Sequence, residues 1–190
     1  MTSIFKKVAI IAIAAVTMSG LANAQSPSFV KGDNVVGLGI GFGGNLYTGS
    51  GYKNKMPAIS VYYENCIKDN LWDDKSSIGV GGMLGYTSAK WEYMNYGWKY
   101  TNFIIGARGT LHYEFVDKLD TYTGMMMGYN IVSSKKIGDH PAGWGGNENA
   151  SAMTWSWFLG ARYYFTNNIA VFSELGYGVA VFNVGVSIKF

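Results

Sequence analysis

Residues 36–43 read Val-Gly-Leu-Gly-Ile-Gly-Phe-Gly, and this stretch decides the fold class. Every second residue is large and apolar, and the residue between is always glycine. A helix is excluded, because each glycine in its interior would cost about 1 kcal/mol relative to alanine. A strand explains the period of two, because successive side chains point to opposite faces. The stretch therefore predicts a strand with one apolar face and one face without side chains.

The same period of two returns along the chain and predicts eight strands in all. In each strand, apolar residues on one face alternate with small or polar residues on the other. The seven further strands are predicted at residues 59–64, 78–86, 102–113, 122–131, 154–165, 171–177 and 183–190. The content of 26 glycines and 16% aromatic residues also favours strands and turns over helices.

The connections between these strands alternate in length. Long connections are predicted after the first, third and fifth strands, at residues 45–55, 90–97 and 133–150. Shorter ones are predicted after the second, fourth and sixth strands, at residues 68–76, 117–119 and 166–168. This alternation is typical of an up-and-down barrel with short turns at one end and longer loops at the other. The last hairpin, around residues 176–179, is the exception because it is short.

The chemistry of the two faces indicates which one meets lipid. Charged residues make up 14% of the chain, whereas a soluble domain has roughly 25%. The face opposite the apolar one carries glycine, serine and threonine with few charges, which suits an interior better than a wet exterior. Aromatic residues gather near the strand ends, as in the girdles of membrane barrels. We therefore expect an all-β, eight-stranded antiparallel up-and-down transmembrane β-barrel. A soluble barrel with its apolar face inside is the alternative architecture.

The first 24 residues have the pattern of a signal peptide. Lys6 and Lys7 precede an apolar run at residues 8–18, and Ala22 and Ala24 provide the small residues of a cleavage site. We expect residues 1–24 to be removed and residues 25–190 to form the barrel. Cys66 is the single cysteine, so the exported chain has no intramolecular disulfide.

The end of the chain carries a family resemblance. Asn183, Gly185, Ile188 and Phe190 resemble the C-terminal sorting signal of bacterial outer-membrane barrels, with Ile188 at a position that is often aromatic. Together with the leader and the eight strands, this ending makes the chain similar to the small barrels of the OmpA/OmpX type. The resemblance implies location in the bacterial outer membrane, contact with its lipid, and recognition by the barrel-assembly machinery during insertion. By default we expect a monomer.

A polar network is predicted inside the barrel. Arg108 and Arg162 are the only arginines, and each ends a Gly-Ala-Arg triplet on strands that run in the same direction. Glu64 and Glu174 project into the same region. His112 and Lys189 are expected nearby. Because eight strands enclose an interior that side chains fill, we expect a closed polar plug. A gated ion path is the alternative.

Motifs for catalysis or cofactor binding are weak in this sequence. His112 and His140 cannot be combined with a serine and an acid into a catalytic set, so we expect no enzyme. Asp139, His140 and Glu148 lack the spacing of metal ligands, and no glycine motif for phosphate is present. We therefore expect no cofactor and no metal. Apart from Lys135 and Lys136 the lysines are scattered, which excludes a nucleic-acid partner.

The third long connection is the strongest remaining candidate for a binding surface. It contains Trp144, flanked by glycine, which could anchor an extracellular partner or pack on the barrel rim. We expect an integral outer-membrane protein with a structural or surface-interaction role through its extracellular loops. A narrow channel for small or hydrophobic solutes ranks second, and a lipid-A-modifying outer-membrane enzyme ranks third.

Overall fold

A computed structural model describes residues 28–44, 46, 52–53, 56–93, 96–138 and 151–190 of the chain. The strands are β1 (Asn34–Phe42), β2 (Tyr52–Lys53), β3 (Ala58–Asp69), β4 (Ser76–Tyr93), β5 (Tyr96–Val116), β6 (Leu119–Ile137), β7 (Ala152–Tyr164), β8 (Ile169–Tyr177) and β9 (Phe182–Lys189). Among the described residues no helix is long and apolar enough to cross a bilayer.

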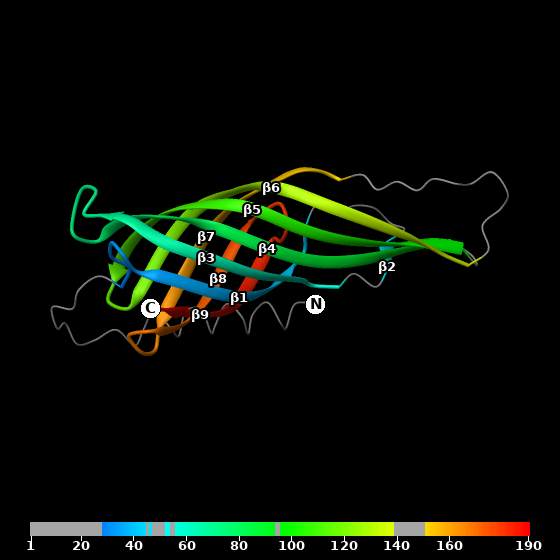
Figure 1. The fold of residues 1–190 in the computed structure, drawn as a ribbon. Coiled ribbons are helices and arrows are strands. Elements are labelled where there is room, and N and C mark those ends of the chain that lie inside the picture. Colours follow the sequence, from blue (N-terminus) through cyan, green and yellow to red (C-terminus); the bar gives the residue numbers. More distant parts are fainter. Residues whose placement is uncertain (1–27, 45, 47–51, 54–55, 94–95, 139–150) are drawn as a thin grey trace.

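Eight of these strands form a closed ring (Figure 1). Each pairs antiparallel with its neighbours, and β1 closes the ring by pairing with β9. The ring begins and ends at one point, because Asn34 and Phe190 exchange two backbone hydrogen bonds of 3.0 and 2.9 Å. Among the described strands, the two-residue strand β2 pairs only with β4, near the C-terminal end of that strand. The predicted fold class and the eight strands are confirmed.

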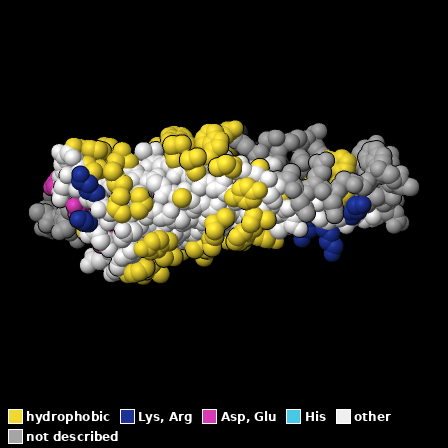
Figure 2. All heavy atoms as spheres, turned by 45° about the horizontal axis from the view of Figure 1, so that its top comes forward, with side chains coloured by type: hydrophobic (Ala, Val, Ile, Leu, Met, Phe, Trp, Pro, Cys, Tyr) yellow, Lys and Arg dark blue, Asp and Glu magenta, His cyan; other side chains and the backbone are white. Residues whose placement is uncertain are grey.

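The alternation in sequence becomes an alternation between lumen and exterior. Ile104 and Ile105 are neighbours in β5, yet Ile104 is 0% exposed in the lumen and Ile105 is 51% exposed outside. Large apolar side chains point outward along every strand of the ring and form an apolar band, and Figure 2 shows patches of them on the face in view. Lysine or arginine side chains lie beyond this band at both ends in that view. The outer surface therefore has the polarity of a protein that is surrounded by lipid.

Inward-facing glycines make room for large side chains in the lumen. A Cβ atom built on Gly37 would lie 2.3 Å from the ring of Tyr62, and one on Gly160 would lie 2.4 Å from the ring of Tyr122. Both tyrosines are at most 2% exposed. The glycine face of the sequence is thus the space into which the tyrosines pack.

Three strands continue well past the rim of the ring. β4, β5 and β6 have 18, 21 and 19 residues, whereas β1, β8 and β9 have 9, 9 and 8. Figure 1 shows them as a three-stranded sheet that extends beyond the barrel, and we call this part the extension. It comprises residues 88–93, 96–101 and 133–137.

The extension corrects two predicted loops. Residues 90–93 and 96–97 are predicted as a loop but belong to β4 and β5, two paired strands in which Trp91 is the partner of Trp98. The predicted loop 133–150 begins too early, because β6 continues to Ile137. The physical reason is that apolar alternation reports only the part of a strand that faces lipid. Beyond that level the alternation continues but changes sides, because Trp91 and Trp98 have the parity of the lumen and Lys90 and Lys99 that of the exterior.

Candidate functional site

The lumen near the short-turn end is filled by a charged network centred on Arg162. This side chain, on β7, is 0% exposed. Its guanidinium donates one hydrogen bond to Glu64 Oε2 at 2.7 Å and another to Asp120 Oδ2 at 3.0 Å. Glu64 comes from β3 and Asp120 from β6, so one arginine ties together three separate strands. Both carboxylates are almost fully buried, and the arginine offsets the cost of burying them.

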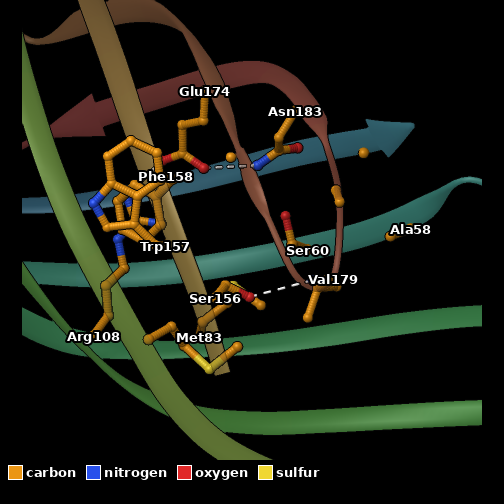
Figure 3. Close-up of a pocket in the computed structure, with 14 residues that line it drawn as sticks. Ala58, Ser60, Met83, Arg108, Ser156, Trp157, Phe158, Glu174, Val179 and Asn183 are labelled. Carbon is orange, nitrogen blue, oxygen red and sulfur yellow. Dashed lines mark hydrogen bonds and ion pairs between the residues drawn. The ribbon is translucent and has the colours of Figure 1, made fainter. Parts of the chain in front are cut away.

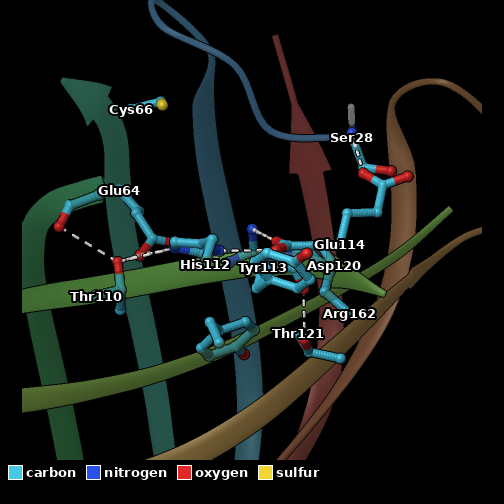
Figure 4. Close-up of polar contacts among 12 residues, drawn as sticks. Ser28, Glu64, Cys66, Thr110, His112, Tyr113, Glu114, Asp120, Thr121 and Arg162 are labelled. Carbon is cyan, nitrogen blue, oxygen red and sulfur yellow. Dashed lines mark hydrogen bonds and ion pairs between the residues drawn. The ribbon is translucent and has the colours of Figure 1, made fainter. Parts of the chain in front are cut away.

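His112 links the same two carboxylates from another side (Figure 4). Its Nδ1 lies 2.8 Å from Asp120 Oδ1, and its Nε2 lies 2.9 Å from Thr110 Oγ1 and 3.3 Å from Glu64 Oε1. The Thr110 hydroxyl donates a hydrogen bond to Glu64 Oε1. The order acid, imidazole, hydroxyl is also that of a catalytic triad. Here, however, the hydroxyl hydrogen is already engaged by a carboxylate.

A second ion pair lies next to this network. Arg108 donates to Glu174 Oε1 at 2.5 Å, and the Tyr122 hydroxyl donates to the same oxygen at 2.9 Å. The Asn183 amide donates to the other carboxylate oxygen at 3.1 Å. The Arg108 guanidinium also stacks over the ring of Phe158, with its carbon 4.0 Å from the ring centroid. Glu174 is therefore fully hydrogen-bonded although it is buried.

The N-terminal segment closes the short-turn end of the barrel. Phe29 precedes β1, is 3% exposed, and lies with its ring centroid 4.4 Å from that of His112. It packs in one apolar cluster with Cys66 and Phe172. Ser28 anchors the segment, because its amide donates to Glu114 and its carbonyl accepts from Lys189 Nζ at 2.9 Å. Phe29 thus acts as a stopper beneath the charged network.

Two small cavities lie on the side of the Arg108 and Glu174 pair that faces away from the short-turn end of the barrel. One of about 40 Å³ has that ion pair in its wall, together with Met83, Phe158 and Asn183 (Figure 3). The other, about 170 Å³, lies at the rim and is lined by residues of the β1 end and the approach to β3. Neither is lined by Thr110, His112 or Asp120. The group of Thr110, His112 and Asp120 therefore borders neither cavity, so a substrate in either one would not contact it.

The structure brings together five of the predicted network residues, Glu64, Arg108, His112, Arg162 and Glu174. It places Lys189 apart from them, where it pairs with Asp33 at 3.4 Å. The reason is that Lys189 is the last residue of β9, below the level of the arginines. Sequence reasoning missed Asp120 and Phe29. Asp120 has the same strand parity as Tyr122, so a strand predicted two residues longer would have placed it in the lumen.

The remaining predicted positions lie at the ends of the chain or outside the described residues. Gly185 and Ile188 belong to β9, with Ile188 55% exposed on the outer face, and Phe190 ends the chain at the seam with β1. Asn183 contacts Glu174 instead of solvent. The remaining predicted positions lie outside the described residues: Ala22, Ala24, Asp139, His140, Trp144 and Glu148. Within the described residues, no group of three or more potential metal ligands is found.

Comparison with known proteins supports the fold. No protein-family model matches the chain, and no curated protein matches it. Ail, the attachment invasion locus protein of Yersinia pestis, is similar in structure. Its complex with the heparin analogue sucrose octasulfate matches with a TM-score of 0.54 and 11% identity, over 85% of this chain and 100% of that chain.

A second structure of Ail gives a TM-score of 0.52 at 12% identity over the same shares of the two chains. The outer membrane protein OprG from Pseudomonas aeruginosa also matches, with a TM-score of 0.40, 11% identity, and coverage of 86% and 99%. At such identities the likeness concerns the fold alone. The resemblance to small eight-stranded barrels is thereby confirmed: this chain has the fold of an eight-stranded outer-membrane β-barrel.

Proposed function

We propose that this protein is an integral barrel of the bacterial outer membrane, closed to solutes, that holds a surface platform in place. The observation that carries the proposal is the filled lumen. Glu64, Asp120 and Glu174 are bound by Arg108 and Arg162 across the lumen, and Phe29 lies beneath them. A path for ions would require several buried ion pairs to break together, and breaking even one is strongly unfavourable.

The platform is the extension of β4, β5 and β6. This three-stranded sheet projects beyond the apolar band and offers a surface at which the cell can meet a partner, as exposed segments on barrels often do. The strand ends that lead into the long connections lie at the same end of the ring as the extension, and we assign this end to the cell exterior. Ail, a barrel of similar fold, has been observed with a bound heparin analogue. That observation concerns Ail, and it supports a surface-interaction role for this fold.

Conductance measurements test the proposal. The purified full mature chain in a planar bilayer should give no current steps above the background of the empty bilayer. The variant Arg108→Ala removes the cation that binds Glu174. It serves as a comparison and should increase the ion current across the bilayer. Regular current steps from the unaltered protein would overturn the closed barrel and favour the narrow channel.

We further infer that the protein is not an enzyme, since the group Thr110, His112 and Asp120 adjoins neither cavity. Mass spectrometry of lipid A from cells with and without the protein tests this inference. Identical spectra are expected. A new or missing acyl or phosphate group that depends on the protein would contradict it.

A further inference from the structure

The outward face of the extension carries three lysines side by side. In the strand register Lys90 of β4 is paired with Lys99 of β5, and Lys99 is paired with Lys135 of β6. Partners in an antiparallel sheet point to the same face, so the three side chains form one row. Lys99 and Lys135 are exposed and Lys90 is half-buried. We call these three residues the lysine row.

The rows beneath it on the same face give its position relative to lipid. Tyr86, Phe103 and Ile131 are register partners, and all three are exposed on the apolar band. The next row is made of hydroxyl residues, Ser88, Thr101 and Ser133. The lysine row comes next. Polarity therefore rises in order along one face, from aromatic and aliphatic side chains through hydroxyls to positive charge.

The spacing of these rows matches a membrane boundary. Four residues separate Tyr86 from Lys90, which is about 13 Å along a strand. With the usual tilt of barrel strands, that is about 10 Å along the barrel axis. The ammonium groups thus lie just above the level of the hydrocarbon, where the headgroups of surrounding lipids are found.

Among the described residues the lysine row has no ion-pair partner, and Glu92, one row further out on the same face of β4, forms no ion pair with it. Like charges directly opposite each other on neighbouring strands destabilise a sheet. None of the three lysines forms an ion pair with a carboxylate of the described residues. By contrast Lys136, on the other face of the extension, lies with its Nζ 5.5 Å from the centre of the Trp98 ring. A row of three adjacent cations at headgroup height calls for an anion from outside the chain.

We propose that the lysine row binds the phosphate groups of a phosphorylated glycolipid in the outer leaflet that surrounds the barrel. This inference rests on the proposed location in the outer membrane. A lipid phosphate fits better than a soluble anion, because the row faces outward above the apolar band instead of toward the barrel mouth. The lipid's acyl chains would lie against Tyr86, Phe103 and Ile131 while its phosphates meet the ammonium groups.

Native mass spectrometry of the full mature chain in detergent, titrated with lipid A that carries two phosphates, tests the proposal. In the variant Lys90→Gln/Lys99→Gln/Lys135→Gln the affinity should fall about tenfold or more, since each lysine near an anionic surface contributes about fivefold. The matched control neutralises three lysines at the other end, Lys31→Gln/Lys68→Gln/Lys75→Gln, and should bind as the unaltered chain does. Arginine at the three row positions should restore binding.

Further arms identify the source of the anion. Lipid A without phosphates should bind equally weakly to the unaltered chain and to the row variant. Inorganic phosphate should not compete at concentrations comparable with the lipid. Equal lipid binding by the row variant would overturn the proposal, and so would a row-dependent response to a sulfated oligosaccharide without any response to lipid.

The result of the lipid-binding test can be distinguished from the result of the conductance test of the proposed function. The row variant should keep or raise its unfolding midpoint, because neutralising the row removes repulsion between like charges. It should stay non-conducting, because the row lies outside the lumen. If the unaltered chain conducts, the closed barrel fails whatever the lipid result. If the chain is closed but the row variant retains its lipid, only the lysine row proposal fails.

Discussion

Arg162 and Glu64 stand 98 residues apart in the chain, and their side chains meet at 2.7 Å inside the barrel. Each comes from a strand on a different side of the ring, so their contact spans the lumen. Both side chains are 0% exposed. The pair therefore joins non-neighbouring strands that the backbone ladder leaves unconnected, and it also closes the lumen.

Removal of this arginine should destabilise the barrel strongly. Arg162→Met leaves Glu64 and Asp120 buried without their cation, which should lower the free energy of unfolding by about 3 kcal/mol or more. Urea unfolding in micelles provides the measurement. The double variant Arg162→Met/Glu64→Gln should be more stable than Arg162→Met alone, because it removes one of the stranded charges. Equal stability of the two variants would mean that the ion pair is not what the arginine contributes.

The inward glycines make a prediction with a matched control. Gly160→Ala places a Cβ against the ring of Tyr122 and should cost about 1 to 3 kcal/mol of stability through overpacking. Gly109 lies in β5 with nothing within 4 Å of the added atom, so Gly109→Ala should be nearly neutral. Unfolding midpoints of the two variants give the comparison. Similar midpoints for both would show that the lumen has room to spare.

The stopper can be tested through the single cysteine. Cys66 is 1% exposed and packs in the same cluster as Phe29. Phe29→Ala should open the short-turn end and raise the rate at which a small maleimide modifies Cys66, by about tenfold for a loss of roughly 1.4 kcal/mol in local protection. Phe115 is 69% exposed on the exterior, and Phe115→Ala should leave the rate unchanged. An unaltered rate in Phe29→Ala would place the barrier elsewhere.

The turn between β3 and β4 should respond to pH. Burial raises the pKa of Asp73, but the Tyr113 hydroxyl and the Lys75 amide donate to its carboxylate and hold that pKa below its ordinary value. The stability that these bonds contribute is present above the unfolded pKa and is lost as pH falls through the folded pKa. Tyr113→Phe should move the pKa of Asp73 back upward, as read from its carboxyl carbon by NMR.

Tyr63→Phe is the control for this titration. The Tyr63 hydroxyl donates to Asn34 and not to Asp73. The pKa of Asp73 should therefore be the same in Tyr63→Phe and in the unaltered chain. A shift as large as that in Tyr113→Phe would point to a general loosening of the short-turn end.

Alternation predicted the strands where lipid imposes it. A strand such as β1 must present apolar side chains outward at every second position, so its sequence carries the period directly. The lumen favours glycine, hydroxyl and paired charged residues at inward positions, but it does not require any one of them at a regular spacing. Arg108, Arg162 and the two glutamates could be placed inside because charges there are rare and their parity is clear.

The features that were missed have other physical origins. The extension lies beyond the lipid, where the outward positions carry Lys90 and Lys99 instead of apolar residues, so the apolar-outward pattern that predicted the other strands ends there. Asp120 follows a turn directly, and a strand end is the least certain part of a pattern. Phe29 precedes the first strand, and only the folded barrel shows that a lone aromatic residue there has a lumen to enter.

The seam between β1 and β9 has a consequence for how the barrel forms. It joins Val35 to Lys189, so it closes almost the whole chain, and its loop-closure entropy exceeds that of any hairpin in the ring. Contacts between such distant residues are slow to form. Until β9 arrives, β1 and β8 expose unpaired backbone groups that can recruit other chains. The arrival time of the eight residues of β9 thus sets how long the nascent barrel is exposed to aggregation.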